Sequence, residues 1–230
     1  MIYTQEAIIV NFRDFSEADK IITLLSKGKG RINAIAKGVR KPKSRKSASI
    51  DLANRASFSL ARGRTFDIIT EVKLLNSYQN NKKSMLKIAS VSFILQLINK
   101  FYSDPGLGED LYEDLRSVLE TLDLISNDIA QISNLVIGFE VKLLDKSGFL
   151  RVPEKRSTHT LQQQRLYKII QFLKNTDFDQ VKKLTTTTKD IDMLDNYVYN
   201  QILNILEKEL KSYQLLKKVL HDEHIAQQKE

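Results

Sequence analysis

The first third of the chain alternates apolar and polar positions over short runs. Five such runs are present, at residues 4–12, 19–26, 30–38, 56–63 and 67–75. β-Branched residues fill the first two, and Phe58 and Leu60 alternate with serines in the fourth, as expected of half-buried strands. Only a short segment near residues 50–54 has a helical character. The pattern predicts a small closed barrel, and an OB-type barrel is the commonest five-stranded form.

After Tyr78 the apolar spacing changes to that of amphipathic helices. Five helices are predicted, at residues 82–103, 109–126, 128–149, 161–175 and 192–213. The first helix places five apolar residues on one core-facing stripe, namely Ile88, Val91, Leu95, Ile98 and Tyr102. Residues 221–230 lack an apolar period and are expected to be disordered. The predicted fold class is α+β multi-domain, with a barrel domain at 1–78 and an all-α helical domain at 79–230.

The composition narrows the classes of protein to which the chain can belong. The 230 residues include no cysteine, which excludes disulfides, thiolate catalysis and cysteine-ligated zinc and is typical of a cytosolic protein. No apolar run approaches the roughly 20 residues of a membrane span. Glu6 and Arg13 interrupt the N-terminal segment, so we expect no cleaved signal peptide.

The formal charge of +8 lies entirely in the first third of the chain. Residues 1–78 hold 15 Lys and Arg against 7 Asp and Glu, whereas residues 79–230 hold 21 of each. Nine of the basic residues fall between Lys27 and Ile50, where there is no acid. Such a patch attracts phosphate backbones or, less often, anionic membrane surfaces. A solvated loop that aids solubility is the simpler alternative, but the clustering favours a polyanionic partner.

Motifs of catalysis and metal binding are missing. Asn33 interrupts the only glycine-rich stretch where GxGxxG would need a glycine, and GxxxxGK[ST] does not occur. Asp190 and Asp192 stand at the start of a predicted helix, where capping is the expected role. The three histidines offer no catalytic or metal-binding constellation: they are His159, His221 and His224. We therefore expect no catalytic residue, no metal and no cofactor.

A nucleic-acid interface fits the basic stretch better. OB barrels present a sheet face and two loops to single strands, with cations on phosphates and aromatic rings under bases. Phe66, at the tip of the last hairpin, is either a stacking platform or a lid on the barrel end, whereas Phe58 belongs to the core. The candidate contacts are Lys27, Lys29, Arg31, Lys37, Arg40, Lys41, Lys43, Arg45, Lys46, Arg62, Arg64 and Phe66.

Four motifs of this region, in this order, resemble the opening of the RecO family of bacterial DNA repair proteins. They are Glu6–Val10, Ser16–Lys20, Gly30–Ile32 and Ala36–Arg45. The hairpin "ARGRTFDIITEVKLL" and the helix "GFEVKLLDKSGF" are also similar to later family segments. The resemblance is specific over the first 78 residues and weaker, though ordered, to roughly residue 220.

The resemblance implies a non-enzymatic recombination mediator of the bacterial cytoplasm, associated with the nucleoid. Such proteins bind single- and double-stranded DNA, anneal complementary strands and help to load the RecA recombinase. They act with RecR and with the single-stranded-DNA-binding protein. Many members carry two zinc-binding CxxC pairs after the "GF" segment. Because "SGFLRVPEKRSTHTLQQQ" contains no cysteine, the chain resembles the zinc-free members.

Two other functions would use the same basic stretch. An RNA-binding or ribosome-associated OB-fold protein would show a similar loop, and only a dependence on the 2′-hydroxyl would distinguish it. A module that docks on an anionic membrane surface would need an amphipathic basic helix. The basic stretch is interrupted by glycines and a proline, so the membrane alternative is the weakest.

Overall fold

The computed structural model describes residues 1–153 and 160–227, and the packing of the chain forms two compact units. We name Met1–Gln79 with Leu95–Arg116 the barrel unit, and Asn80–Ile94 with Ser117–Glu230 the helical unit. The predicted domains at 1–78 and 79–230 stay a prediction. The packing adds Leu95–Arg116 to the residues that surround the barrel.

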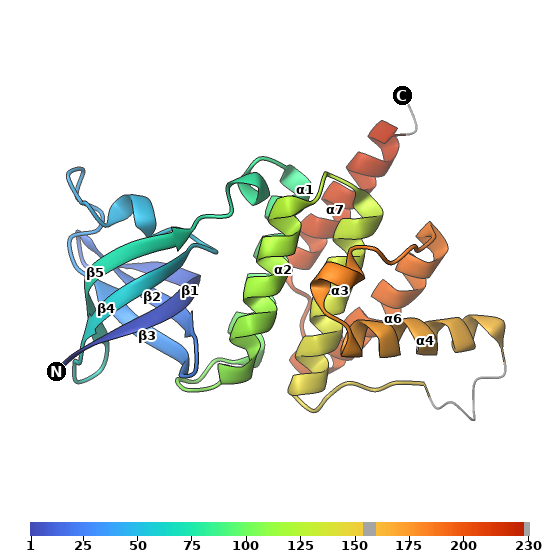
Figure 1. The fold of residues 1–230 in the computed structure, drawn as a ribbon, viewed down its shortest axis with the longest axis horizontal. Coiled ribbons are helices and arrows are strands. Elements are labelled where there is room, and N and C mark those ends of the chain that lie inside the picture. The colour runs from blue at the N-terminus through green and yellow to red at the C-terminus, as the bar shows by residue number, and fades with distance from the viewer. Residues whose placement is uncertain (154–159, 228–230) are drawn as a thin grey trace. The chain divides into compact units, whose positions relative to one another are not determined.

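The barrel unit contains a closed five-stranded barrel with the strand order β1-β2-β3-β5-β4 (Figure 1). The strands are β1 (Ile2–Phe15), β2 (Asp19–Ser26), β3 (Gly30–Ala36), β4 (Arg55–Ala61) and β5 (Asp67–Asn76). All neighbouring pairs are antiparallel except β3 and β5, which pair in parallel over only two residue positions. The predicted OB-type barrel followed by a helical region is therefore confirmed.

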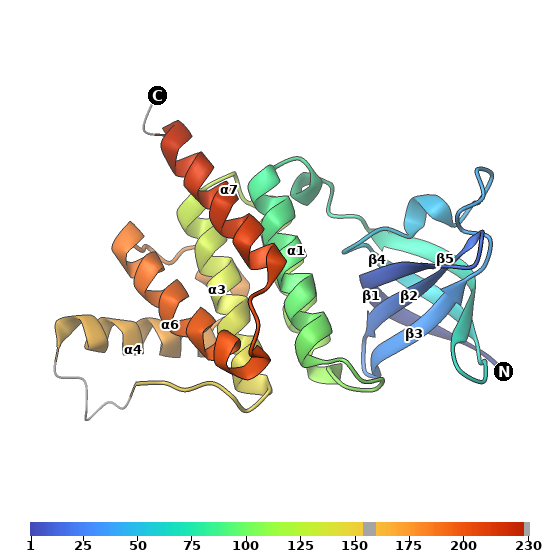
Figure 2. The same cartoon turned by 180° about the vertical axis from the view of Figure 1, so that it is seen from behind.

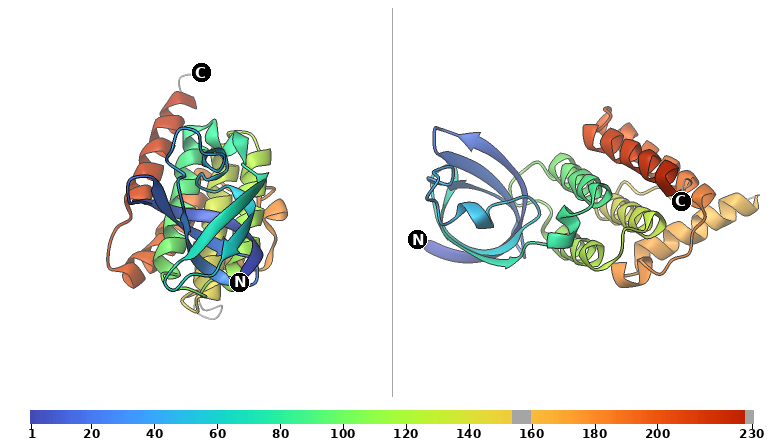
Figure 3. Two further views of the ribbon diagram at one scale, coloured as in Figure 1. Left: turned by 90° about the vertical axis from the view of Figure 1, so that its left-hand side faces the viewer. Right: turned by 90° about the horizontal axis from the view of Figure 1, so that it is seen from above.

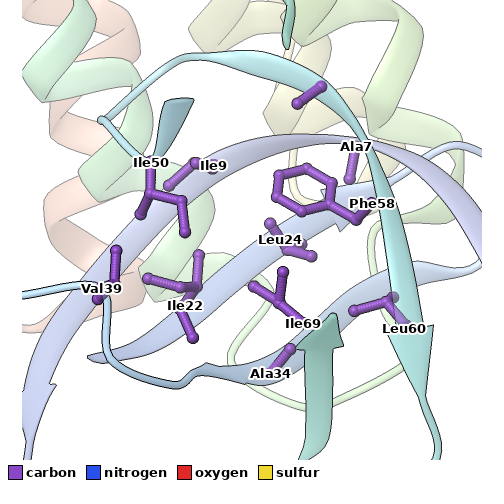
Figure 4. Packing of buried hydrophobic residues seen from close by; sticks show 12 residues of the cluster. Ala7, Ile9, Ile22, Leu24, Ala34, Val39, Ile50, Phe58, Leu60 and Ile69 are labelled. Atoms are coloured by element: carbon purple, nitrogen blue, oxygen red, sulfur yellow. The ribbon is translucent and has the colours of Figure 1, made fainter. Parts of the chain in front are cut away.

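The interior of the barrel is filled by alternate residues of every strand (Figure 4). Phe58 is fully buried there, as predicted, beside Ile22 and Leu24. The inward positions are apolar because a closed barrel of this size leaves no room for water among its side chains.

The outer faces of β1 and β2 are also apolar and buried. Ile8 and Val10 lie on the outside of β1, and Ile21 and Leu25 on the outside of β2. The segment Leu95–Arg116 covers these faces: Asn99 Nδ2 donates to the Val10 carbonyl at 2.8 Å, and the Leu25 side chain lies against Gly108. Burial on both faces explains why β2 reads as the continuous apolar run "IITLL".

Seven α-helices are assigned in the described residues. They are α1 (Met85–Phe101), α2 (Tyr112–Leu124), α3 (Ile129–Lys146), α4 (Leu161–Asn175), α5 (Phe178–Val181), α6 (Thr188–Leu206) and α7 (Lys211–Gln227). Three short 3₁₀ turns accompany them: η1 (Ser47–Ser49), η2 (Gln79–Lys82) and η3 (Glu109–Leu111). Within the helical unit α3 is the central helix and packs against α4, α5, α6 and α7 (Figure 2).

Several helix boundaries differ from the predicted ones. The predicted helix at 192–213 is two helices, because Glu207 caps α6 in the left-handed conformation with φ 52°. The helix also begins earlier, at Thr188, where Thr187 and Asp190 form a capping box. The capping role expected of Asp190 is thereby confirmed. The short helix expected near residues 50–54 is instead the 3₁₀ turn at Ser47–Ser49.

Two expectations were wrong, one about the burial of a side chain and one about the order of the C-terminal residues. Ile88 is 39% exposed, whereas Val91, Leu95 and Ile98 of the same predicted stripe are buried. Residues 221–227, expected to be disordered, continue α7, which Leu216 and Val219 anchor by burial. Residues 228–230 of the expected tail lie outside the described residues.

Candidate nucleic-acid interface

β3 divides the basic stretch of the sequence between two ends of the barrel. Lys27 and Lys29 lie in the turn before β3, and the cations from Lys37 onward lie in the loop after it. A strand rises about 3.3 Å per residue, so the seven residues of β3 separate the two groups by roughly 20 Å. Figures 1 and 2 show the β3–β4 loop at one end of the barrel and the β2–β3 turn at the other, and Figure 3 shows the barrel in two further views.

The β3–β4 loop is anchored to the barrel at both of its ends. Gly38 N donates to Asp19 Oδ1 at 2.7 Å, and Arg40 N donates to the Ala18 carbonyl at 3.0 Å. Val39 and Ile50 are buried in the barrel core. This anchoring gives the polar residues between them a defined backbone from which to project.

Two cations of this loop have partners inside the barrel unit. Arg40 lies 3.3 Å from the Asp14 carboxylate and donates to the Ser16 carbonyl. Lys46 is half-buried, and its Nζ donates to the Ile69 carbonyl at 3.1 Å, beside the short parallel pairing of β3 and β5. Arg40 and Lys46 therefore position the loop, whatever else they contact.

The remaining four cations of the loop are exposed, and none forms an ion pair with a described residue. We name them the loop end: Lys37, Lys41, Lys43 and Arg45. Ser44 N donates to the Lys41 carbonyl at 2.9 Å, which closes a turn within the loop. No aromatic residue lies between Lys37 and Lys46, so this end offers charge without a stacking surface.

A second set of exposed cations lies at the other end of the barrel. We name it the hairpin end: Lys29, Arg62 and Arg64. The β4–β5 hairpin meets the start of β1 there, since Arg62 N donates to the Met1 carbonyl at 3.1 Å. Lys29 Nζ lies 4.2 Å from the centroid of the Tyr3 ring. Phe66 is half-buried and is not a member of the barrel core cluster.

Tyr3 is an aromatic component of the hairpin end that the sequence pattern did not reveal. Its hydroxyl donates to the Asp67 carboxylate. Burial, with this hydrogen bond second, raises the pKa of Tyr3 to about 12. Tyr3 lies just before the first predicted strand, at residues 4–12, and only the fold brings Lys29 over its ring. Arg13, an exposed cation of β1, likewise lies just outside that predicted strand.

Lys27 and Arg31 are occupied by the segment that covers the barrel. Lys27 lies 3.5 Å from Glu113. Arg31 Nη1 donates to Asn99 Oδ1 at 3.1 Å and to the Tyr102 carbonyl at 3.0 Å. Partial burial lowers the pKa of the Arg31 guanidinium, and the charge of Asp104 opposes this effect. Arg31 thus anchors Leu95–Arg116 to β3.

This cover changes the expected binding surface. OB barrels use the face of their second and third strands for oligonucleotides. Here Leu25 and Arg31 of that face contact the segment Leu95–Arg116. The exposed cations that the structure brings together lie at the two ends of the barrel.

The remaining findings concern metal binding and membrane crossing. No group of three or more His, Cys, Asp or Glu side chains in the described ranges could hold a metal ion. His221 is exposed, His224 Nδ1 lies 2.8 Å from the Leu220 carbonyl, and His159 lies outside the described residues. Within residues 1–153 and 160–227, no helix has the length and apolar character needed to cross a membrane.

Comparison with known proteins gives a consistent result. Residues 1–78 match the family described as "Recombination protein O N terminal". A DNA repair protein RecO of Pelotomaculum thermopropionicum is 32% identical over 156 residues, which cover 68% of this chain and 59% of that protein. One from Dehalococcoides mccartyi (strain 195) is 26% identical over 241 aligned residues, which cover 91% and 93%. The chain spans between half and two thirds of the length of the relatives that match first.

Proposed function

The chain belongs to the RecO family of DNA repair proteins, and we propose that it is a non-enzymatic, DNA-binding recombination mediator. In this role it binds single- and double-stranded DNA and anneals complementary strands. It also helps to load the RecA recombinase, together with RecR and the single-stranded-DNA-binding protein. The relatives are named for DNA repair, and the family membership supports the extension of that role to this chain.

One observation supports DNA as the ligand more than any other. The four cations of the loop end project from an anchored loop and have no carboxylate partner among the described residues. A protein that neutralises phosphates with such cations releases counterions, so its affinity falls steeply with salt. Contacts of this kind are made to the backbone of the nucleic acid and do not depend on its sequence.

The segment that covers the barrel face supports the same reading. Because base stacking on the face of β2 and β3 is restricted, the interface is dominated by phosphate contacts. A mediator that handles any damaged sequence requires binding without sequence preference, and backbone contacts provide it. Recognition of this type also accepts duplexes, in which the bases are stacked and paired.

The test is charge reversal at the loop end in the full chain. The triple variant Lys41→Glu, Lys43→Glu, Arg45→Glu is expected to weaken binding to all DNA sequences alike. The plot of log affinity against log salt should flatten by roughly 0.7–0.9 for each phosphate that the variant no longer neutralises. Fluorescence anisotropy with labelled oligonucleotides over a salt series measures both quantities.

A matched control comes from the helical unit. Lys208→Glu, Lys211→Glu, Lys218→Glu changes the total charge by the same amount at exposed positions and should leave affinity and slope near the parent values. Equal losses in both variants would show that only total charge matters and would contradict a defined interface. Tighter binding to RNA than to DNA of the same sequence would favour the RNA-binding alternative.

A further inference from the structure

We propose that one barrel holds two nucleic-acid strands at once, one at the loop end and one at the hairpin end. This inference rests on the DNA-binding function proposed above and adds to it a geometry for bringing two strands together. It follows from how the fold distributes the cations, which the order of residues in the sequence does not reveal.

The two ends lie on opposite sides of the barrel. Lys29 and Arg62 are tied to the start of β1, through the Tyr3 ring and the Met1 carbonyl. The β3–β4 loop is tied to the end of β1, where Arg40 contacts Asp14 and Ser16. Figures 1 and 2 both show the β3–β4 loop and the β4–β5 hairpin at opposite ends of the barrel.

No continuous row of cations joins the two ends along β3. Arg31, the cation of this strand, is occupied by Asn99 and Tyr102. The covering segment brings acidic side chains to this side, among them Glu113, which pairs with Lys27. A single strand that ran from one end to the other over this face would meet these carboxylates, which repel phosphates.

The route over β4 and β5 offers one exposed cation, Lys73, and the exposed Glu71 lies beside it on the same face of β5. Ser59, Thr70 and Glu71 lie along it, and Thr70 Oγ1 is occupied by the Ser59 carbonyl. Arg55 is half-buried, with Glu6 at 3.8 Å. Because neither route tracks a phosphate backbone, the two ends act as separate contact surfaces.

The two ends differ in what they offer a strand. The loop end provides four cations and no ring, so it contacts backbone phosphates of a single strand or a duplex alike. The hairpin end adds the half-buried ring of Phe66 to its three cations, whereas the Tyr3 ring packs against the barrel core. Aromatic rings beside cations favour an unpaired strand, whose bases are free to stack.

Two strands held on one molecule meet at a raised effective concentration. The second strand then pairs in an effectively intramolecular step, which increases the rate without any further contact. Annealing should therefore require both ends, whereas binding of one strand requires only one of them. This difference separates the inference from simple DNA binding.

The experiment compares two triple variants of the full chain. The loop variant is Lys41→Glu, Lys43→Glu, Arg45→Glu, the hairpin variant is Lys29→Glu, Arg62→Glu, Arg64→Glu, and the control is the Lys208, Lys211, Lys218 variant described above. Two non-complementary single strands, one with a donor dye and one with an acceptor, report bridging by energy transfer. Sedimentation under the same conditions gives the mass of the bridged complex, and circular dichroism confirms folding.

The parent protein and the control should bridge the two strands in a complex with one protein molecule. Each end variant should still bind one strand, fail to bridge two strands and anneal complementary strands at least tenfold more slowly. Three results would overturn the inference: one strand per parent molecule, bridging only by a protein dimer, or unchanged annealing in both variants. A parent protein that binds no DNA would instead overturn the proposed function itself.

Discussion

In the barrel unit the free positive charge lies on exposed ends, whereas in the helical unit a carboxylate lies buried in the core. Counted by compact unit, the barrel unit holds 17 Lys and Arg against 12 Asp and Glu, and the helical unit 19 against 16. The net charges of +5 and +3 differ little. They are similar because Leu95–Arg116 contributes five acids to the barrel unit. The two units differ instead in where their charges lie.

Arg31 and Glu140 show the contrast at single residues. Arg31 of the barrel unit is half-buried and stays charged, with two oxygen partners for its guanidinium. Glu140 of α3 is fully buried, and neither of its carboxylate oxygens has a hydrogen-bond partner among the described residues. Burial, with the charge of Asp195 second, raises the pKa of Glu140 well above its ordinary value. The oxygen partners of Arg31 favour its charged form, although its buried Nε has none, whereas burial without partners favours the protonated form of Glu140.

The largest expected effect is on stability and concerns the barrel unit. Gly30 has φ 63°, and a Cβ there would lie 2.5 Å from the carbonyl oxygens of Gly106 and Leu107 in the covering segment. Gly30→Ala should cost about 1–3 kcal/mol from overpacking, in addition to the roughly 1–2 kcal/mol of a left-handed L-residue. Urea unfolding of the full chain measures the decrease in the free energy of unfolding.

Gly28 provides the matched control for this prediction. It has φ 74°, but a Cβ there would meet no atom within 4 Å. Gly28→Ala should therefore carry only the conformational cost. If both variants lower the free energy of unfolding equally, the covering segment is not seated against β3, and Arg31 would be free to contact DNA.

The next effect concerns the helical side and depends on pH. Four ionisable side chains interact electrostatically with Glu140. They are Asp195 and Tyr199 of α6, and Tyr213 and Lys217 of α7. Because the pKa of Glu140 is raised on folding, the native state binds more protons than the unfolded state above the ordinary value of 4.5. The free energy of unfolding should then fall as pH rises, with a slope of at most about 1.4 kcal/mol per pH unit from this group.

Glu140→Gln should remove that slope, because the amide does not titrate. The variant is expected to be more stable than the parent at pH 8 and to show a flatter profile between pH 5 and 8. Thermal unfolding followed over that range measures both, and the exposed Glu17→Gln is the control. A parent and a Glu140→Gln variant with parallel profiles would mean that Glu140 is ionised in the fold, with a partner that these contacts do not provide.

The sequence predicted the barrel well because its strands follow simple rules. Alternation at Phe58 and Leu60 and the break in period after Tyr78 predict strands and helices in the right order. The exposed cations of the loop end were also predictable, since a run of Lys and Arg without acids must face water. Local pattern carries this information without help from tertiary contacts.

The missed features are those that distant contacts create. Arg31 reads as one more basic residue, and only Asn99 and Tyr102, about seventy positions later, show that it is occupied. Glu140 reads as a polar helix position, because its burial depends on α6 and α7. The break at Glu207 was hidden by an apolar spacing that continues across it. In each case the deciding partner is not a sequence neighbour.

The smallest expected effect is none, and it concerns metal removal. Four thiolates in a closed tetrahedral site would couple zinc binding to folding, but this chain has no cysteine and only three histidines. His221 and His224 lie on α7, more than sixty positions from His159, so a fourth ligand would have to come from a carboxylate. Incubation with a chelator should therefore leave the melting temperature and the DNA annealing of the full chain unchanged. Stoichiometric zinc in the purified protein, together with a melting temperature that falls on chelation, would instead reveal a metal site that stabilises the helical unit.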